Sequence, residues 1–293
     1  MNNPPYDVIS RAEQEAFYKA HPCNIIRLVL GKQYPDDTEE NNRYTRAAAT
    51  LKQWLKEGTL VKRDRPGLMI YRMQFDHPEF GRRQLDGIVA LVKVDDYGKG
   101  KVLPHEKTYK GPKADQLNIM RHCRANVTPI HALFDDQADE VAAQYTRFMQ
   151  GPVHQQTVDS NGTVHQTWIV EDEETISRIV ESMSDKSIFI ADGHHRYETA
   201  LAYRKEQQAS GGVEIGGPGD YVMMYLTSMT HPGLTILPAH RMVTGLNEVD
   251  VPRILEKLEP YFYSEKLCFS EGNRAEVSQR LIERIASYSE IGG

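Results

Sequence analysis

An apolar strand that runs directly into a polar, glycine-containing turn constrains this chain more than any other feature. The run Ser187–Ala191 has the composition of a buried strand, and Asp192–Arg196 (Asp-Gly-His-His-Arg) follows it at once. Beyond the turn, Tyr197, Ala200 and Leu201 are spaced for the inward face of a helix. The order strand, glycine turn, helix predicts an α/β unit with polar groups gathered at the start of the helix.

This turn has the residue types of a phosphate site. The first N–H groups of a helix lack partners within it and carry partial positive charge, so they attract anions. We expect Gly193 to let the backbone approach a ligand closely and Arg196 to bind phosphate with two parallel hydrogen bonds. Either histidine, His194 or His195, is suited to proton transfer near neutral pH. Asp192 is a candidate general base or Mg²⁺ ligand. A plain N-cap aspartate and a surface arginine are the structural alternative.

A second candidate cluster occupies the loop 103–115. Glu106 is the candidate base toward a hydroxyl group, and Lys107, Thr108, Lys110 and Lys113 are candidate phosphate ligands. The alternative is a solvated charged loop, which is what charge runs usually form. Three further residues complete the expected site: Arg124 for phosphate, and Asn126 and Glu198 for the substrate or for orienting His194.

A third candidate is Leu237–Arg241, in which His240 and Arg241 follow an apolar run. Ends of strands are where sites lie in α/β folds, so these two residues are candidate substrate ligands. A partly exposed strand end explains the pattern equally well. The segment Pro4–Asp7 is expected to form a turn and nothing more.

The hydrophobic patterning predicts an α+β (mixed α/β) fold. Helices are expected over 43–57, 115–124 and 171–184, after the turn at 196, and twice after Asp250 as an N-cap. Ser160-Asn161-Gly162 predicts a tight hairpin turn. Strands are expected over 24–30, 68–75, 87–94, 129–134, 187–191, 221–228 and 234–237.

Composition narrows the class of protein. The formal charge of −6, from 35 basic and 41 acidic residues, argues against sequence-blind nucleic-acid binding. No apolar run approaches the roughly 20 residues of a membrane span, and the start of the chain has no secretory pattern. Three widely spaced cysteines indicate neither a disulfide framework nor a zinc knuckle. We therefore expect a cytoplasmic protein without a membrane partner.

Several large enzyme classes lack their motifs here. The chain has no His-Glu-x-x-His, no Gly-x-Ser-x-Gly, no Walker loop and no Gly-x-Gly-x-x-Gly after a strand. Adjacent histidines point about 100° apart on a helix, so His194 and His195 are poorly placed to share one metal ion.

The clusters, taken in order, resemble a bacterial and archaeal family known as domain of unknown function 1015. The stretches that carry the resemblance cover most of the chain: 4–10, 103–108, 111–115, 124–126, 191–200 and 237–241. A more distant likeness is to the ParB–sulfiredoxin superfamily, which includes CTP-hydrolysing partition proteins, sulfiredoxin and kinases of free serine. In it, a Gly-x-x-Arg turn after a strand binds nucleotide phosphates.

This second resemblance implies a ParB/sulfiredoxin-like core over 101–245, after an antiparallel α+β portion over 1–100. The remaining segment, 246–293, is expected to be helical and shorter than in other family members. Partition proteins have Gly-Glu-Arg-Arg where this chain has Gly-His-His-Arg, and sulfiredoxin has a reactive cysteine there, so redox repair is not expected.

The free serine kinases are the nearest functional analogue. The resemblance implies a nucleotide-dependent phosphotransferase for a small hydroxyl metabolite, best guessed as L-serine, with ATP or ADP and Mg²⁺ as cofactors. The site could also run in reverse or hydrolyse phosphoserine. The alternative is a nucleotide-binding regulatory protein of the ParB type, with or without nucleic-acid association. The sequence leaves the oligomeric state open.

Overall fold

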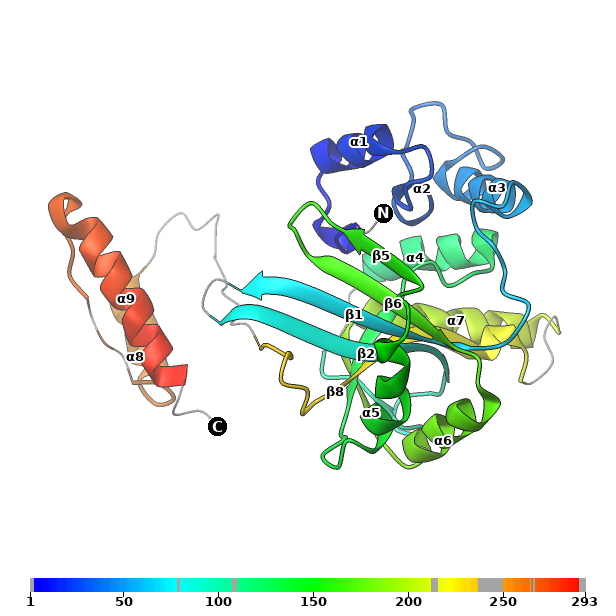
Figure 1. Cartoon of the computed structure of the whole chain (residues 1–293). Coiled ribbons are helices and arrows are strands. Elements are labelled where there is room, and N and C mark those ends of the chain that lie inside the picture. The colour runs from blue at the N-terminus through cyan, green and yellow to red at the C-terminus, as the bar shows by residue number, and fades with distance from the viewer. Residues whose placement is uncertain are drawn as a thin grey trace. The chain divides into compact units, whose positions relative to one another are not determined.

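The computed structural model describes residues 3–77, 80–106, 110–211, 216–236, 250–263, 265 and 267–289. The chain divides into two compact units, Met1–Ile236 and Leu237–Gly293. Figure 1 shows the first unit as a twisted sheet with helices packed around it. The predicted mixed α+β class is confirmed.

Within the described residues, an eight-stranded sheet forms the centre of the first unit, in the order β3-β7-β4-β8-β2-β1-β6-β5. Two neighbouring pairs are parallel, β3 with β7 and β4 with β8, and the other pairs are antiparallel. The strands are β1 (Leu68–His77), β2 (Gly81–Lys93), β3 (Val102–Leu103), β4 (Ile130–Phe134), β5 (Gln155–Val158), β6 (Val164–Val170), β7 (Ile188–Asp192) and β8 (Tyr221–Ser228).

One face of the sheet carries the hydrophobic core. Ile70 lies opposite Ile88, which lies opposite Leu226; on the next strands Leu226 pairs with Ala132, and Ala132 with Ile190. Residues paired across neighbouring strands point to the same face of a sheet, so these five side chains share one face. All five are buried. The helices add Val141, Ile179, Tyr197 and Ala200 to the same cluster.

Seven α-helices lie in the described part of the first unit. Figure 1 shows α1, α2 and α3 grouped together, with α4 and α7 beside the sheet. Packing joins α3 to α4, α4 to α7, and α5 to α6. The helices are α1 (Arg11–Ala20), α2 (Ile26–Val29), α3 (Arg43–Lys56), α4 (Lys110–Cys123), α5 (Glu140–Tyr145), α6 (Glu173–Met183) and α7 (His194–Ala209).

Local sequence signals explain where several elements begin. The Asn42 side chain accepts the N–H groups of Tyr44 and Thr45 at 3.0 and 3.2 Å, which caps α3. The β5–β6 hairpin turns at Gly162, whose φ of +80° favours glycine. The helix from residue 43 and the hairpin were predicted, and both are confirmed, as are the strands and helices expected at β1, β4, β7, β8, α6 and α7.

Two predicted strands are wrong. Asn24–Leu30 contains the helix α2, because the Asn24 side chain accepts the Ile26 N–H at 2.9 Å and starts a helical turn. Leu28 then packs against Trp54 and Ala47 of α3, so the apolar run belongs to a buried helix. Residues 234–236 form no strand, and Leu237 lies outside the described residues.

Two helices of the second unit agree with the prediction: α8 (Val251–Leu258) and α9 (Arg274–Ser289). Asp250 is the N-cap of α8, since its carboxylate accepts the Arg253 N–H at 3.1 Å, and Pro252 lies in the first turn. None of the helices in the described ranges combines the length and apolar character that a membrane span requires.

Candidate functional site

The Asp192–Arg196 turn joins β7 to α7. Gly193 adopts φ 103° and ψ 29°, a left-handed conformation that side chains rarely take. A Cβ atom at Gly193 would lie 2.8 Å from Nε of Arg196, so a side chain there would also have to move the end of the arginine side chain. As the N-cap residue it has no side chain, and α7 begins without a side-chain cap. The start of this helix therefore keeps its capacity to bind an anion.

Arg196 locks the turn in place. Its guanidinium forms an ion pair with the Asp192 carboxylate and donates a hydrogen bond to the Pro129 carbonyl. The Arg196 side chain is only 17% exposed, whereas that of Asp192 is 61% exposed. Two of the predicted site residues thus contact each other, and Arg196 also ties the turn to the residue before β4.

The second predicted cluster meets the turn because of strand pairing. β3 runs parallel to β7 with Leu103 opposite Phe189, so both strands end at the same edge of the sheet. His105 and Glu106 follow β3 just as His194 follows β7. The His105 backbone N–H donates to Nε2 of His194 at 3.3 Å, and the two rings meet edge to face with centroids 4.5 Å apart.

His194 is 4% exposed, and this burial lowers its pKa. The neighbouring His105 lowers the pKa further, whereas Glu106, Asp192 and Glu198 raise it. Burial disfavours the charged form of a histidine. His194 is therefore a neutral imidazole at pH 7, and its Nε2 is the acceptor in the bond from His105.

His105, Glu106 and His194 could together hold a metal ion, since one ligand atom from each lies within 4.8 Å of the others. Two imidazoles and a carboxylate with an open fourth position are a donor set found in catalytic zinc sites. Mg²⁺ prefers oxygen ligands, which makes the exposed Asp192 carboxylate the better candidate for that ion.

Lys113 and Glu198 form an ion pair that joins α4 to α7, so Lys113 lies beside the helix that carries Glu198. Arg124 directly follows α4, has a φ of +49° and is exposed; among the described residues no side-chain contact joins it to the turn. Asn126 and Arg196 line a small cavity of about 20 Å³, enough for a single water molecule.

That cavity has two buried polar atoms on its wall. Nε2 of Gln116 and Oγ1 of Thr199 have no hydrogen-bond partner within the described part of the chain. Buried polar groups normally have a partner, and this cavity is polar and large enough for one water molecule.

Four predicted site residues lie outside the described residues: Lys107, Thr108, His240 and Arg241. Lys110 begins α4, but its side chain is likewise outside the description. His195 is the second residue of α7 and is partly exposed.

Tyr6 is a neighbour of the turn that the sequence analysis missed. It lies in a short 3-10 helix (Tyr6–Val8), and burial followed by the charge of Asp7 raises its pKa. The charges of Arg196 and Asp192 also act on it, which places the phenol near the turn. The segment Pro4–Asp7 was predicted to be a turn only, because nothing in its local sequence indicates that it lies near residues 192–196.

A strip of polar and aromatic side chains crosses the second face of the sheet and was also missed. We call His131, Tyr225, Tyr71 and His165 the sheet strip. The rings of His131 and Tyr225 stack with centroids 5.1 Å apart, and Tyr225 meets Tyr71 edge-on at 5.1 Å. Across β2 the residue between them is Gly87, whose Cβ would lie 2.7 Å from Tyr225. The sequence signal for this strip is the alternation of polar or aromatic residues with apolar ones, as at His131 and Tyr225.

Hydrogen bonds fix both ends of the sheet strip. The Tyr71 hydroxyl bonds to Nδ1 of His165 at 2.6 Å, and Nε2 of His165 faces the Asp159 carboxylate at 3.3 Å. At the other end, Nε2 of His131 lies 3.0 Å from Oγ1 of Thr227. His131 also pairs with Asp192 across β4 and β7, and burial lowers the pKa of His131. The strip therefore connects the Asp192–Arg196 turn with the β5–β6 hairpin.

A cleft of about 930 Å³ opens over the far end of the sheet strip. Tyr71 and His165 line it from the sheet, Pro4 and Pro5 from the start of the chain, and Pro129 from the loop that binds Arg196. This volume is in the range of small-molecule sites, which is about 300–1,000 Å³. A ligand in the cleft would lie next to the segment that holds the turn.

The sequence profile of the family described as "Protein of unknown function (DUF1015)" matches residues 1–288, so the chain belongs to that family. No curated protein and no solved structure matched the chain.

Proposed function

We propose that this member of the family is a nucleotide-dependent phosphotransferase acting on a small hydroxyl compound. The observation that carries the proposal is the position of Glu106, whose carboxylate lies within 4.8 Å of a ring nitrogen of His194 at the start of α7. A candidate proton acceptor and a helix terminus suited to phosphate therefore meet at one edge of the sheet.

In the proposed reaction the acceptor hydroxyl lies between Glu106 and the bound nucleotide. Its oxygen forms a bond to the terminal phosphorus while Glu106 takes the proton. The bond from that phosphorus to the bridging oxygen breaks, and its electron pair stays with the departing nucleoside diphosphate. Phosphoryl transfer depends mainly on positioning and on stabilising charge, which the N–H groups of α7, Arg196 and neutral His194 would supply.

The cationic side chains at the site are already paired, so an anionic substrate would depend on the N–H groups of α7 and on Mg²⁺. Arg196 and Lys113 bring two cations to the start of α7, and each is paired with one carboxylate, Asp192 or Glu198. A nucleotide would bind as its Mg²⁺ complex. The exposed Asp192 carboxylate is the oxygen ligand that would hold this ion, and the ion would neutralise part of the phosphate charge.

L-serine is the acceptor to test first. The Gly-x-x-Arg turn, Gly193 to Arg196, is similar to that of the ParB–sulfiredoxin superfamily, which includes kinases of free serine. The same site would support the reverse transfer or the hydrolysis of phosphoserine, because both reactions pass through the same transferred group.

A thermal-shift panel tests the proposal. ATP, ADP, CTP, pyrophosphate, serine and phosphoserine are each added with Mg²⁺ to the wild type, Arg196→Ala and Arg178→Ala. A ligand at 100 times its Kd stabilises the fold by about 2.7 kcal/mol. We expect a nucleotide or phosphoserine to raise Tm in the wild type and in Arg178→Ala, whose exposed arginine pairs with Glu174 on α6, but not in Arg196→Ala.

Glu106→Gln covers the case in which Arg196→Ala does not fold, and it should bind the same ligand without turnover. The proposal is wrong if no phosphate compound stabilises the wild type, or if Arg178→Ala loses the shift as fully as Arg196→Ala.

A further inference from the structure

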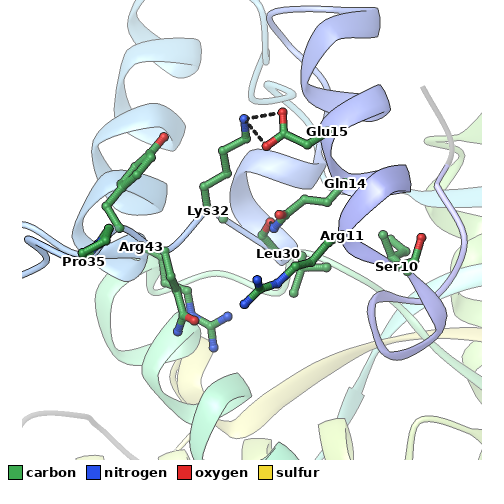
Figure 2. A pocket seen from close by; sticks show the side chains of 12 residues that line it. Ser10, Arg11, Gln14, Glu15, Leu30, Lys32, Pro35 and Arg43 are labelled. Atoms are coloured by element: carbon green, nitrogen blue, oxygen red, sulfur yellow. Dashed lines mark hydrogen bonds and ion pairs between the residues drawn. The ribbon is translucent and has the colours of Figure 1, made fainter.

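A basic cleft lies between α1 and the segment that leads into α3 (Figure 2). Its volume is about 720 Å³, and its lining includes three cationic side chains, Arg11, Lys32 and Arg43, against one carboxylate, Glu15. The whole chain carries a formal charge of −6, so a positive cleft runs against the overall balance. Such a local excess is expected where an anion binds.

Two of these cations already have partners. Nζ of Lys32 lies 2.7 Å from the Glu15 carboxylate, as the dashed lines in Figure 2 show. The Arg43 guanidinium pairs with Asp115 of α4 and lies 3.1 Å from the Tyr44 hydroxyl. Nε of Arg43 is nevertheless buried with no partner among the described residues, so Asp115 does not satisfy this side chain completely.

Arg11 is the cation without a partner. It is the first residue of α1, where the helix dipole disfavours positive charge, and it is exposed. Within the described ranges no ion pair or hydrogen bond is formed by its side chain. Figure 2 shows its guanidinium turned across the cleft toward that of Arg43. Two like charges that face each other are stabilised when an anion lies between them.

We propose that this cleft binds a phosphate-bearing small molecule between Arg11 and Arg43. The planar fork of arginine matches the oxygens of a phosphate group and can donate two parallel hydrogen bonds to it. The cleft also has room for the rest of a small ligand. Lys32, held by Glu15, adds positive charge to the wall beside them.

This site is separate from the Asp192–Arg196 turn and does not rest on the proposed function. Asp115, which holds Arg43, and Lys113, which pairs with Glu198 of α7, are two residues apart on α4. Two residues span about 200° around a helix, so these side chains leave α4 on different sides. The helix therefore separates the cleft from α7.

Isothermal titration with pyrophosphate at low ionic strength tests the site, because surface charge interactions weaken with salt. Arg11→Ala is compared with Lys19→Ala, which removes one positive charge from the last turn of the same helix, outside the cleft. Arg11 is exposed and lacks a described partner, so its replacement should leave the fold intact, as circular dichroism would show.

We expect Arg11→Ala to weaken pyrophosphate binding at least tenfold and Lys19→Ala to change it less than twofold. Arg196→Ala should retain the site that Arg11→Ala loses, whether or not the turn binds pyrophosphate as well. Equal affinity in Arg11→Ala and the wild type would overturn the proposal. An equal loss of affinity in Lys19→Ala would also overturn it. So would a complete loss of pyrophosphate binding in Arg196→Ala.

Discussion

Arg196 and Asp192 form an ion pair across the first turn of α7, and the Arg196 guanidinium lies directly over Gly193. The ion pair, the hydrogen bond to Pro129 and the left-handed glycine together hold the candidate site in one conformation. The conformation of the turn is therefore set by contacts among Asp192, Gly193 and Arg196 and by the hydrogen bond to Pro129.

Gly193→Ala should destabilise the protein strongly. The left-handed backbone costs a side chain about 1–3 kcal/mol, and the new methyl group would also displace Arg196. Gly162→Ala is the matched control, because φ is +80° there but nothing lies within 4 Å of the added atom. In urea denaturation, Gly193→Ala should lose more free energy of unfolding than Gly162→Ala. Equal losses would show that Arg196 does not cover the turn.

Acidification should destabilise the fold from about pH 6.5 downward. Burial lowers the pKa values of His194 and His131 below the ordinary value of 6.5. Between the folded and unfolded pKa values the unfolded chain binds more protons, so the free energy of unfolding rises with pH. This stabilisation is complete above about pH 6.5 and is lost as the pH falls.

Urea midpoints between pH 7.5 and 5.5 measure this dependence. His194→Gln should show a smaller decrease than the wild type, whereas His122→Gln, at an exposed position, should follow the wild type. A decrease in His194→Gln as large as in the wild type would contradict the burial of a neutral imidazole.

Much of the fold could be predicted from the sequence, because periodic apolar residues and caps act locally. Asp250 marked a helix start, and Asn161-Gly162 marked the hairpin. Asn24–Leu30 could not be decided in this way, since a short apolar run fits a strand or a buried helix equally well. Packing against Trp54 made it helical.

The site was predicted only in pieces. The sequence identified the loop with Glu106 and the turn with His194, but their meeting depends on the parallel pairing of β3 with β7. Such long-range pairing leaves no local signal. The sheet strip was missed for the same reason, since Tyr71 and Tyr225 contact each other only because Gly87 lies between their strands.

Co²⁺ should bind at His105, Glu106 and His194. Their ligand atoms are close enough to share one ion, and imidazole nitrogens favour such metals over Mg²⁺. We expect visible absorption on adding Co²⁺, which Zn²⁺ displaces and His105→Ala abolishes. His122→Ala removes an exposed histidine of α4 and should leave the spectrum unchanged. A spectrum that survives His105→Ala would exclude this site.

Tyr71→Phe should cost about 1–3 kcal/mol of unfolding free energy, because Nδ1 of the buried His165 loses its partner. Tyr34→Phe removes a hydroxyl from a side chain that is 49% exposed and should cost much less. Urea denaturation of both variants measures the difference. If Tyr71→Phe is as stable as the wild type, the bond does not hold the sheet strip together.

Phosphorus NMR of the reaction mixture tests the central claim most directly. The protein is incubated with ATP, Mg²⁺ and L-serine, and then with other small hydroxyl compounds in turn. The account predicts a phosphomonoester signal with the wild type and with Glu39→Gln. Glu39 is exposed and distant from Glu106 in the sequence. Glu106→Gln should be slower by about 100-fold or more, the usual contribution of a positioned base. The absence of any phosphomonoester with every acceptor, or an unchanged rate in Glu106→Gln, would contradict it.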